Sequence, residues 1–188
     1  MNAAGPRPAL LACVALLGCA LAGCASGPPD LEALDRRIEV ERFMGDWYVL
    51  AFIPIDLPFF SEAEAHGAVE SYRLDDDGGI DITYTFRDGS FEAEPTVMHQ
   101  SGRVVEDGRG TEWRVQLLWP FESAYLIAWL DAEYTRAIVG VPSRRYVWIL
   151  SREPVVPDAE LEALEGRVSE LGYDASELRA VPQRAAAR

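Results

Sequence analysis

Apolar and polar residues alternate along most of the chain after residue 42. In the segment IDITYTFR (80–87), the even-numbered positions are apolar or aromatic, and the odd-numbered positions are charged or carry hydroxyl groups. The segments TEWRVQLLW (111–119) and YVWILSR (146–152) repeat this period of two. Such alternation is typical of strands that bury one face. Eight segments of this kind predict eight β-strands between about residues 43 and 152.

Short turn signals join these segments, among them DDDGG (75–79) and EDGRG (106–110). The connections leave no room for crossover helices. Consecutive antiparallel strands of this kind predict an up-and-down meander, which removes its edges by closing into a barrel. The predicted fold class is therefore all-β, an eight-stranded antiparallel β-barrel.

One helix is predicted after the strands, at about 158–171. Its leucine and valine residues fall on one stripe, and Gly172 provides a stop. We expect this C-terminal helix to pack on the barrel, followed by a final strand at about 178–182 and a disordered tail at 183–188.

The N-terminal residues have the order of a bacterial lipoprotein leader. Arg7 precedes the apolar run ALLACVALLGCALA, which is too short for a stable membrane span. LAGC follows, and it predicts a signal peptide at 1–23, lipidation of Cys24 and a tether at 24–37. Cys19, at the end of LLGC, is the alternative lipidation site, and an ordinary cleaved secretion signal is the other interpretation. Two or more acyl chains on the cysteine would anchor the protein stably.

Composition narrows the chemistry of the mature chain. The three cysteines, Cys13, Cys19 and Cys24, lie in or at the end of the leader, which excludes thiol chemistry and disulfides from the barrel. The chain has no lysine, so Schiff-base chemistry and the P-loop lysine are excluded too. Its net charge of −14 disfavours nucleic acid and anionic lipid surfaces as partners.

Candidate catalytic groups are sparse. The two histidines, His66 and His99, lie in segments predicted to be well separated, and no G-x-S-x-G motif frames a serine. In SEAEAH, the alternating Glu62, Glu64 and His66 offer a metal-ligand set, but a solvated loop at the barrel mouth is the favoured alternative. The sequence therefore predicts a protein that is not an enzyme, with no cofactor and no metal.

Three segments in order carry a resemblance to one family: GDW (45–47), LDAEYTRAIVG (130–140) and YVWILSREP (146–154). Together with the eight strands and the helix, they resemble the lipocalins, specifically the bacterial outer-membrane lipoprotein type related to apolipoprotein D. The resemblance covers a domain at 38–182. It implies a small hydrophobic ligand, a fatty acid or lysophospholipid, and attachment to the periplasmic face of the outer membrane. Retention in the inner membrane is the alternative location.

The resemblance also implies a structural role for the first strand. It places Trp47, with Gly45 before it, at the closed end of the barrel and Arg152 across the indole ring. A guanidinium in that position forms a cation–π pair, and it can also bind carbonyls of the N-terminal turn. Arg144 and Arg145 are expected at the closed end as well, and so are not predicted to bind a headgroup.

The inward-facing aromatic residues are the predicted ligand contacts. The interpretation of Tyr125 and Trp148 also rests on their match to lining positions of similar bacterial lipocalins. The same inward aromatics could instead fill the core. The full predicted set is Tyr84, Phe86, Trp113, Tyr125, Trp129 and Trp148.

Three functions remain open at this stage. A lipid carrier, which we favour, needs an open and dry cavity. A non-transporting scaffold for envelope partners needs a filled barrel, and a lipid-modifying enzyme needs a polar cluster inside it. A homodimer is compatible with each of the three.

Overall fold

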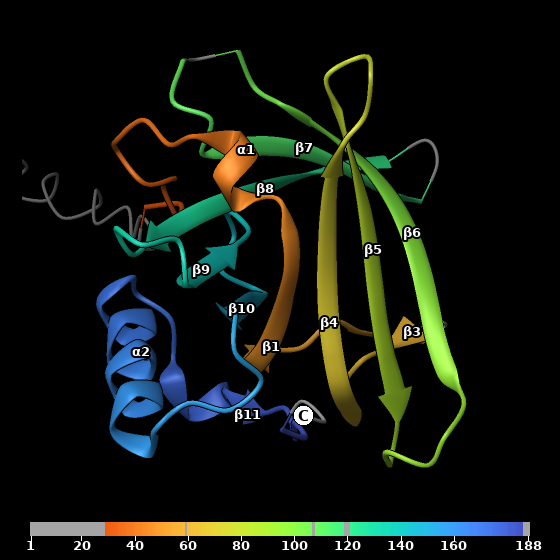
Figure 1. The fold of residues 1–188 in the computed structure, drawn as a ribbon. Coiled ribbons are helices and arrows are strands. Elements are labelled where there is room, and N and C mark those ends of the chain that lie inside the picture. The colour runs from red at the N-terminus through yellow and green to blue at the C-terminus, as the bar shows by residue number, and fades with distance from the viewer. Residues whose placement is uncertain (1–28, 59, 107, 119–120, 186–188) are drawn as a thin grey trace, which may run out of the picture.

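The strands close into an antiparallel barrel, as the alternation predicts (Figure 1). The computed structural model describes residues 29–58, 60–106, 108–118 and 121–185. Strands pair in chain order, and the last one returns to the first. The eight barrel strands are β1 (Gly45–Ile53), β4 (Ala65–Leu74), β5 (Gly79–Asp88), β6 (Pro95–Val104), β7 (Glu112–Leu118), β8 (Phe121–Leu130), β9 (Arg136–Gly140) and β10 (Val147–Ser151). The predicted fold class is confirmed.

Burial follows the sequence alternation where the strands are regular. In β5, Ile80, Ile82, Tyr84 and Phe86 are buried in the barrel interior, and the residues between them face outward. Apolar side chains leave water on one face of the strand only, which fixes its register against both neighbours.

The register of β1 defines the two ends of the barrel. Gly45 pairs with Tyr72 at one end, and Ile53 pairs with Val147 at the other. The short helix α1 (Val40–Phe43) covers the first, closed end. The second end carries the β1–β4 connection, with the two-residue strands β2 (Asp56–Leu57) and β3 (Phe60–Ser61), and it is the open end.

The turn between β9 and β10 lies at the open end, because Gly140 and Val147 pair there. The prediction that Arg144 and Arg145 lie at the closed end is therefore wrong. The sequence indicates that these residues form a turn. The end of the barrel at which this turn lies follows only from the order of the strands, counted from β1.

Helix α2 (Asp158–Glu170) packs outside the barrel wall. Its buried residues, Leu164 and Val168, join a second apolar cluster with outward-facing residues such as Ile138 and Ile149. A 3₁₀ turn (Ala175–Glu177) leads to β11 (Arg179–Ala180), which pairs with β1. Among the described residues, no helix has the length and hydropathy needed to cross a membrane.

The described part of the predicted tether, residues 29–37, lies along the barrel rather than away from it. The Leu31 amide donates to the Pro142 carbonyl (2.8 Å) and the Leu34 amide to the Ile127 carbonyl (2.8 Å). Leu31 is buried because its side chain joins the apolar cluster beneath α2. The closed barrel and both apolar clusters therefore form within residues 29–185.

Candidate ligand-binding site

An arginine closes one end of the barrel. The Arg152 guanidinium carbon lies 3.8 Å from the centroid of the Trp47 ring. Its NH groups donate to the carbonyls of Asp46 (2.7 Å), Phe43 (2.9 Å) and Met44 (2.8 Å). Gly45 has φ +96° and leaves only 3.3 Å between the position of a Cβ atom and the guanidinium. The structure thus brings together the three residues assigned to barrel closure.

A layer of aromatic rings covers this closure and forms the floor of the interior. Trp113 stacks on Tyr125, with ring centroids 5.7 Å apart and an interplanar angle of 17°. Tyr72 meets the Trp113 ring edge-on at 5.5 Å. The indole NH of Trp113 donates to the Gly110 carbonyl (2.9 Å), so its polar atom is satisfied at the closed end.

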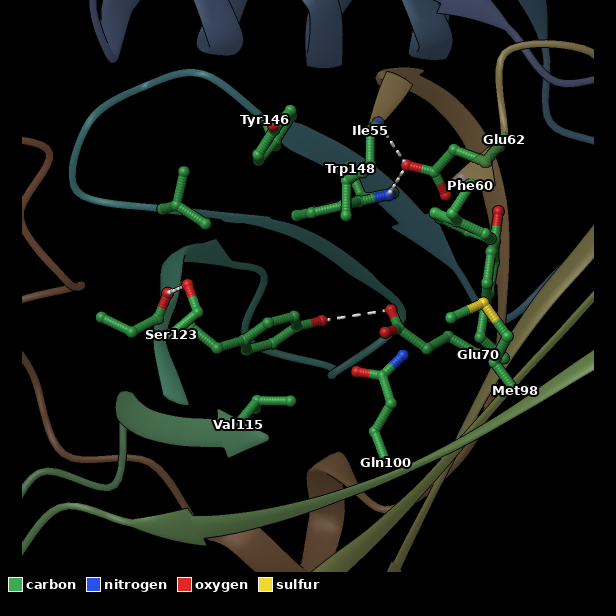
Figure 2. Close-up of a pocket in the computed structure, with 14 residues that line it drawn as sticks. Ile55, Phe60, Glu62, Glu70, Met98, Gln100, Val115, Ser123, Tyr146 and Trp148 are labelled. Atoms are coloured by element: carbon green, nitrogen blue, oxygen red, sulfur yellow. Dashed lines mark hydrogen bonds between the residues drawn. The ribbon is translucent and has the colours of Figure 1, made fainter. Parts of the chain in front are cut away.

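Above this floor, toward the open end, lies an internal cavity of about 80 Å³, which we call the barrel cavity (Figure 2). Its wall is mainly apolar and aromatic. Phe60, Met98 and Tyr146 are half-buried parts of this wall, and Trp148 contributes an indole ring. Four polar lining residues also face it: Glu62, Glu70, Gln100 and Ser123.

Glu70 belongs to a hydrogen-bonded chain at the cavity floor. The Tyr125 hydroxyl donates to the Glu70 carboxylate (3.1 Å) and is itself hydrogen-bonded to the Tyr72 hydroxyl. Figure 2 shows the Gln100 amide directed toward the same carboxyl. Burial raises the pKa of Glu70 to about 7, and the nearby Glu62 adds to that rise, while hydrogen bonds from the two tyrosines oppose it.

Glu62 fixes the β1–β4 connection over the cavity. One carboxylate oxygen accepts hydrogen bonds from the Ile55 amide (2.8 Å) and from the indole NH of Trp148 (3.2 Å) (Figure 2). The side chain is buried, and burial raises its pKa despite these donors. Glu62 thus ties a loop between strands to the wall of the barrel.

Tyrosines complete the polar surface of the cavity. Burial and the neighbouring acids raise the pKa of Tyr72, Tyr84 and Tyr125 well above the ordinary value, so all three stay neutral. The Tyr84 hydroxyl is buried beside the Glu62 carboxyl, and it has no partner in full hydrogen-bond geometry among the described residues. An unsatisfied buried hydroxyl on a cavity wall indicates a place where a ligand group can bind.

The predicted aromatic contacts divide into three groups. Tyr84, Tyr125 and Trp148 line the barrel cavity. Phe86 and Trp113 are buried inside the barrel but behind the lining, where they contact the rings of Tyr84 and Tyr125.

Trp129 lies on the opposite face of the wall, which differs from the prediction. It packs in the cluster beneath α2, and the Arg167 guanidinium lies 4.7 Å from its ring centroid. The reason is a bulge in β8 between Ile127 and Trp129, which shifts the register against β9 by one residue. A shift of one residue turns a side chain from the inner to the outer face.

Sequence reasoning missed both buried acids as site residues. A signal for Glu70 is present in AVESYRL, where it shares the inward parity of Ala68 and Tyr72. Glu62 carries no such signal. Its predicted alternative role in a metal-ligand set does not match the described structure, because Glu64 is exposed and no group of metal-ligating residues forms there.

The closed eight-stranded barrel holds an internal cavity above an aromatic floor, which is the architecture of small barrels that can hold one small molecule. The family model of the lipocalin-like domain matches residues 38–183, and the chain therefore belongs to the lipocalin family. The predicted resemblance is confirmed, including its bacterial outer-membrane lipoprotein type.

Curated relatives support this type. The outer membrane lipoprotein Blc of Vibrio cholerae is 30% identical over 179 residues, covering 93% of this chain and 96% of the relative. The Blc protein of Escherichia coli K12 is 29% identical over 159 residues, covering 83% and 85%. Temperature-induced lipocalin-1 of Arabidopsis thaliana is 28% identical over 158 residues, covering 79% and 81%.

Solved structures with low sequence identity share the fold. The cockroach allergen Per a 4 superposes with a TM-score of 0.61 at 18% identity, covering 83% of this chain and 95% of that one. Lobster apocrustacyanin A1 gives a TM-score of 0.56 at 14% identity, with coverage of 77% and 79%. Family and fold together support a lipocalin that binds a hydrophobic ligand.

Proposed function

We propose that this protein binds a single-chain lipid inside the barrel while it is anchored to the outer membrane through Cys24. The observation that carries the proposal is the barrel cavity, which combines an apolar wall with a closed aromatic floor. Burial of each methylene group contributes roughly 0.8 kcal/mol before ordering costs, so a hydrocarbon chain is the natural occupant. Fatty acids and lysophospholipids are the candidate ligands.

The size of the cavity favours a narrow ligand. Its volume of about 80 Å³ is smaller than the roughly 150 Å³ cavity that admits benzene in an engineered protein. A longer chain must therefore displace side chains at the mouth. Phe60, Met98 and Tyr146 are only half-buried, so they can move at lower cost than the buried floor.

The position of the N-terminal segment supports function at a membrane. Pro29 and Leu31 are hydrogen-bonded to residues of the β9–β10 turn, at the open end. Cys24 precedes Pro29 by five residues, which span at most about 18 Å when extended. An acylated Cys24 would therefore hold the cavity mouth near the lipid surface. The named relatives are outer membrane lipoproteins, which agrees with this location.

The two buried acids satisfy the condition set above for an enzyme, a polar cluster inside the cavity. Each carboxyl, however, already accepts hydrogen bonds from protein groups. We therefore assign them to ligand recognition and to loop closure, and the proposed function remains binding rather than catalysis.

The test is a tryptophan-fluorescence titration of delipidated residues 25–188 with palmitate and with a lysophospholipid at micromolar concentrations. Trp148 lines the cavity, so bound lipid should quench or shift its emission. Trp148→Ala should weaken binding by about 1–3 kcal/mol. Trp129→Ala is the matched control, because this indole lies outside the barrel, and it should leave the affinity unchanged. If neither lipid changes the emission of the unmodified sequence, the scaffold function replaces the carrier.

A further inference from the structure

The floor of the barrel cavity is acidic, although its walls are apolar. Glu70 lies there with the hydroxyls of Tyr72 and Tyr125, and the Tyr84 hydroxyl lies on the neighbouring strand, in register with Glu70. Glu62 is the other ionisable group nearby, on the β1–β4 connection. The described residues that line the cavity on β6, β7, β8 and β10 include no arginine or histidine, and the chain has no lysine.

We propose that the ligand enters head first and that its head is a primary ammonium group, which binds Glu70 while the hydrocarbon chain extends toward the mouth. This inference rests on the proposed function and specifies which single-chain amphiphile the same cavity prefers.

Hydrogen-bonding capacity supports an ammonium group. A carboxylate offers about four acceptor positions, and the hydroxyls of Tyr125 and Tyr72 leave some of those on Glu70 unfilled. The Tyr84 hydroxyl oxygen, which accepts no hydrogen bond among the described residues, offers a further acceptor. A primary ammonium brings three donors and no acceptor. It therefore matches groups that the protein itself leaves incompletely satisfied.

A carboxylate head and insertion of the methyl end first are both less favourable than an ammonium head. A carboxylate head would place a third acid beside Glu62 and Glu70, where no cationic side chain lines the wall. A methyl end at the floor would place hydrocarbon against the buried Glu70 carboxyl and Tyr84 hydroxyl, which gives neither group a new hydrogen-bond partner. Among single-chain amphiphiles, the acidic floor thus favours an ammonium head over a carboxylate head and over tail-first insertion.

The protonation state of Glu70 makes the affinity for the ligand depend on pH. Its pKa of about 7 means that roughly one-eleventh of the molecules are ionised at pH 6 and ten-elevenths at pH 8. An alkylammonium keeps its charge over this range, since its pKa lies near that of lysine, about 10.4. Affinity for the amine should therefore rise about tenfold from pH 6 to pH 8. Affinity for a carboxylate should fall over the same range.

The experiment is calorimetric titration of delipidated residues 25–188 with decylamine, decanol and decanoate at pH 6, 7 and 8. At pH 8 we expect decylamine to bind at least about tenfold more tightly than decanoate, with decanol between them. The titration with decylamine at pH 7 is repeated in buffers of different ionisation enthalpy. It should show that binding releases about half a proton per ligand. Equal affinities of amine and carboxylate at pH 8, or pH slopes of the same sign, would overturn the inference while leaving the proposed function intact.

Variants separate the local contact from general attraction to an acidic protein. Glu70→Gln should lower decylamine affinity about tenfold or more at pH 8 and abolish its pH dependence, since the amide cannot ionise. Glu122→Gln is the matched control, because it removes one exposed carboxylate of β8 and should change neither quantity. Decyltrimethylammonium, which has charge but no N–H donor, should bind more weakly than decylamine; equal binding would contradict recognition by Glu70. If no decyl probe binds at any pH while palmitate or the lysophospholipid binds in the fluorescence titration, the inference fails alone; if those lipids also fail to bind, the proposed function fails with it.

Discussion

Arg152 is the residue on which the closed end depends most directly. Its guanidinium covers one face of Trp47 and donates to backbone carbonyls on both sides of the turn from α1 into β1. Carbonyls at the end of a helix have no intrahelical partner, so a fixed fork of donors is well suited to satisfy several at once. The closure is therefore a hydrogen-bonding device as well as a cation–π contact.

Replacement of Arg152 by alanine should lower the free energy of unfolding by about 1–3 kcal/mol, because it exposes the indole and leaves carbonyls unpaired. Urea denaturation measures this loss. Arg103→Ala is the control, since its ion pair with Glu122 is exposed and should contribute less than about 1 kcal/mol. In a double-mutant cycle with Trp47→Ala, the two effects should be non-additive; strict additivity would mean that the pair has no energetic coupling.

At the scale of elements, the sequence predicts strands and helix better than it predicts faces. The regular alternation of β5 gives its inward residues correctly, because no insertion interrupts the period of two. In β8, the extra residue at the bulge is Ala128, which is small and apolar like many strand residues. The residue type of Ala128 does not show that two residues of β8 lie opposite one residue of β9 at this point. The uninterrupted alternation consequently predicts Trp129 inside the barrel.

The missed part of the site has a different cause. A single glutamate in a strand usually indicates a solvent-facing position, since burying a carboxylate without partners is costly. The partner that makes Glu70 tolerable is Tyr125, which lies 55 residues away in the sequence. Such a pairing depends on the closure of the barrel, so local patterns cannot reveal it. Tyr84, Tyr125 and Trp148 can be predicted because their positions in the strand alternation mark them as inward, and because Tyr125 and Trp148 match lining positions of similar bacterial lipocalins.

The predicted leader lies outside the described residues, and it would decide where the protein resides. We expect Cys24→Ser to abolish metabolic labelling with radioactive palmitate and to release the protein from the membrane fraction, because no other group would carry the acyl chains. Cys19→Ser is the matched control and should remain labelled. The opposite result, with labelling lost only in Cys19→Ser, would move the anchor to the alternative site.

For the whole molecule, the acidic floor links ligand recognition to stability. Burial of a carboxyl destabilises its charged form. Ionisation of the carboxyl at higher pH therefore lowers the stability of the folded state. Glu62 and Glu70 both have raised pKa values for this reason. The barrel should therefore be less stable at the pH where the proposed amine binds best, and the ligand should restore that stability by binding the folded state.

Glu70 gives this link a definite sign. Its pKa is about 7 in the folded state and 4.5 when unperturbed, so between these values the unfolded chain has lost a proton that the folded protein keeps. Stability therefore falls as the pH rises through this window.

Relative to Glu70→Gln, the unmodified protein should lose about 2–3 kcal/mol of unfolding free energy between pH 5 and pH 8. Urea denaturation of both proteins at the two pH values measures the difference; Glu62 is present in both proteins, so it enters the comparison only through its coupling to Glu70. Glu122→Gln should follow the unmodified protein at both pH values, because its carboxyl is exposed. A difference between the unmodified protein and Glu70→Gln that stays constant with pH would show that Glu70 titrates as an ordinary surface acid.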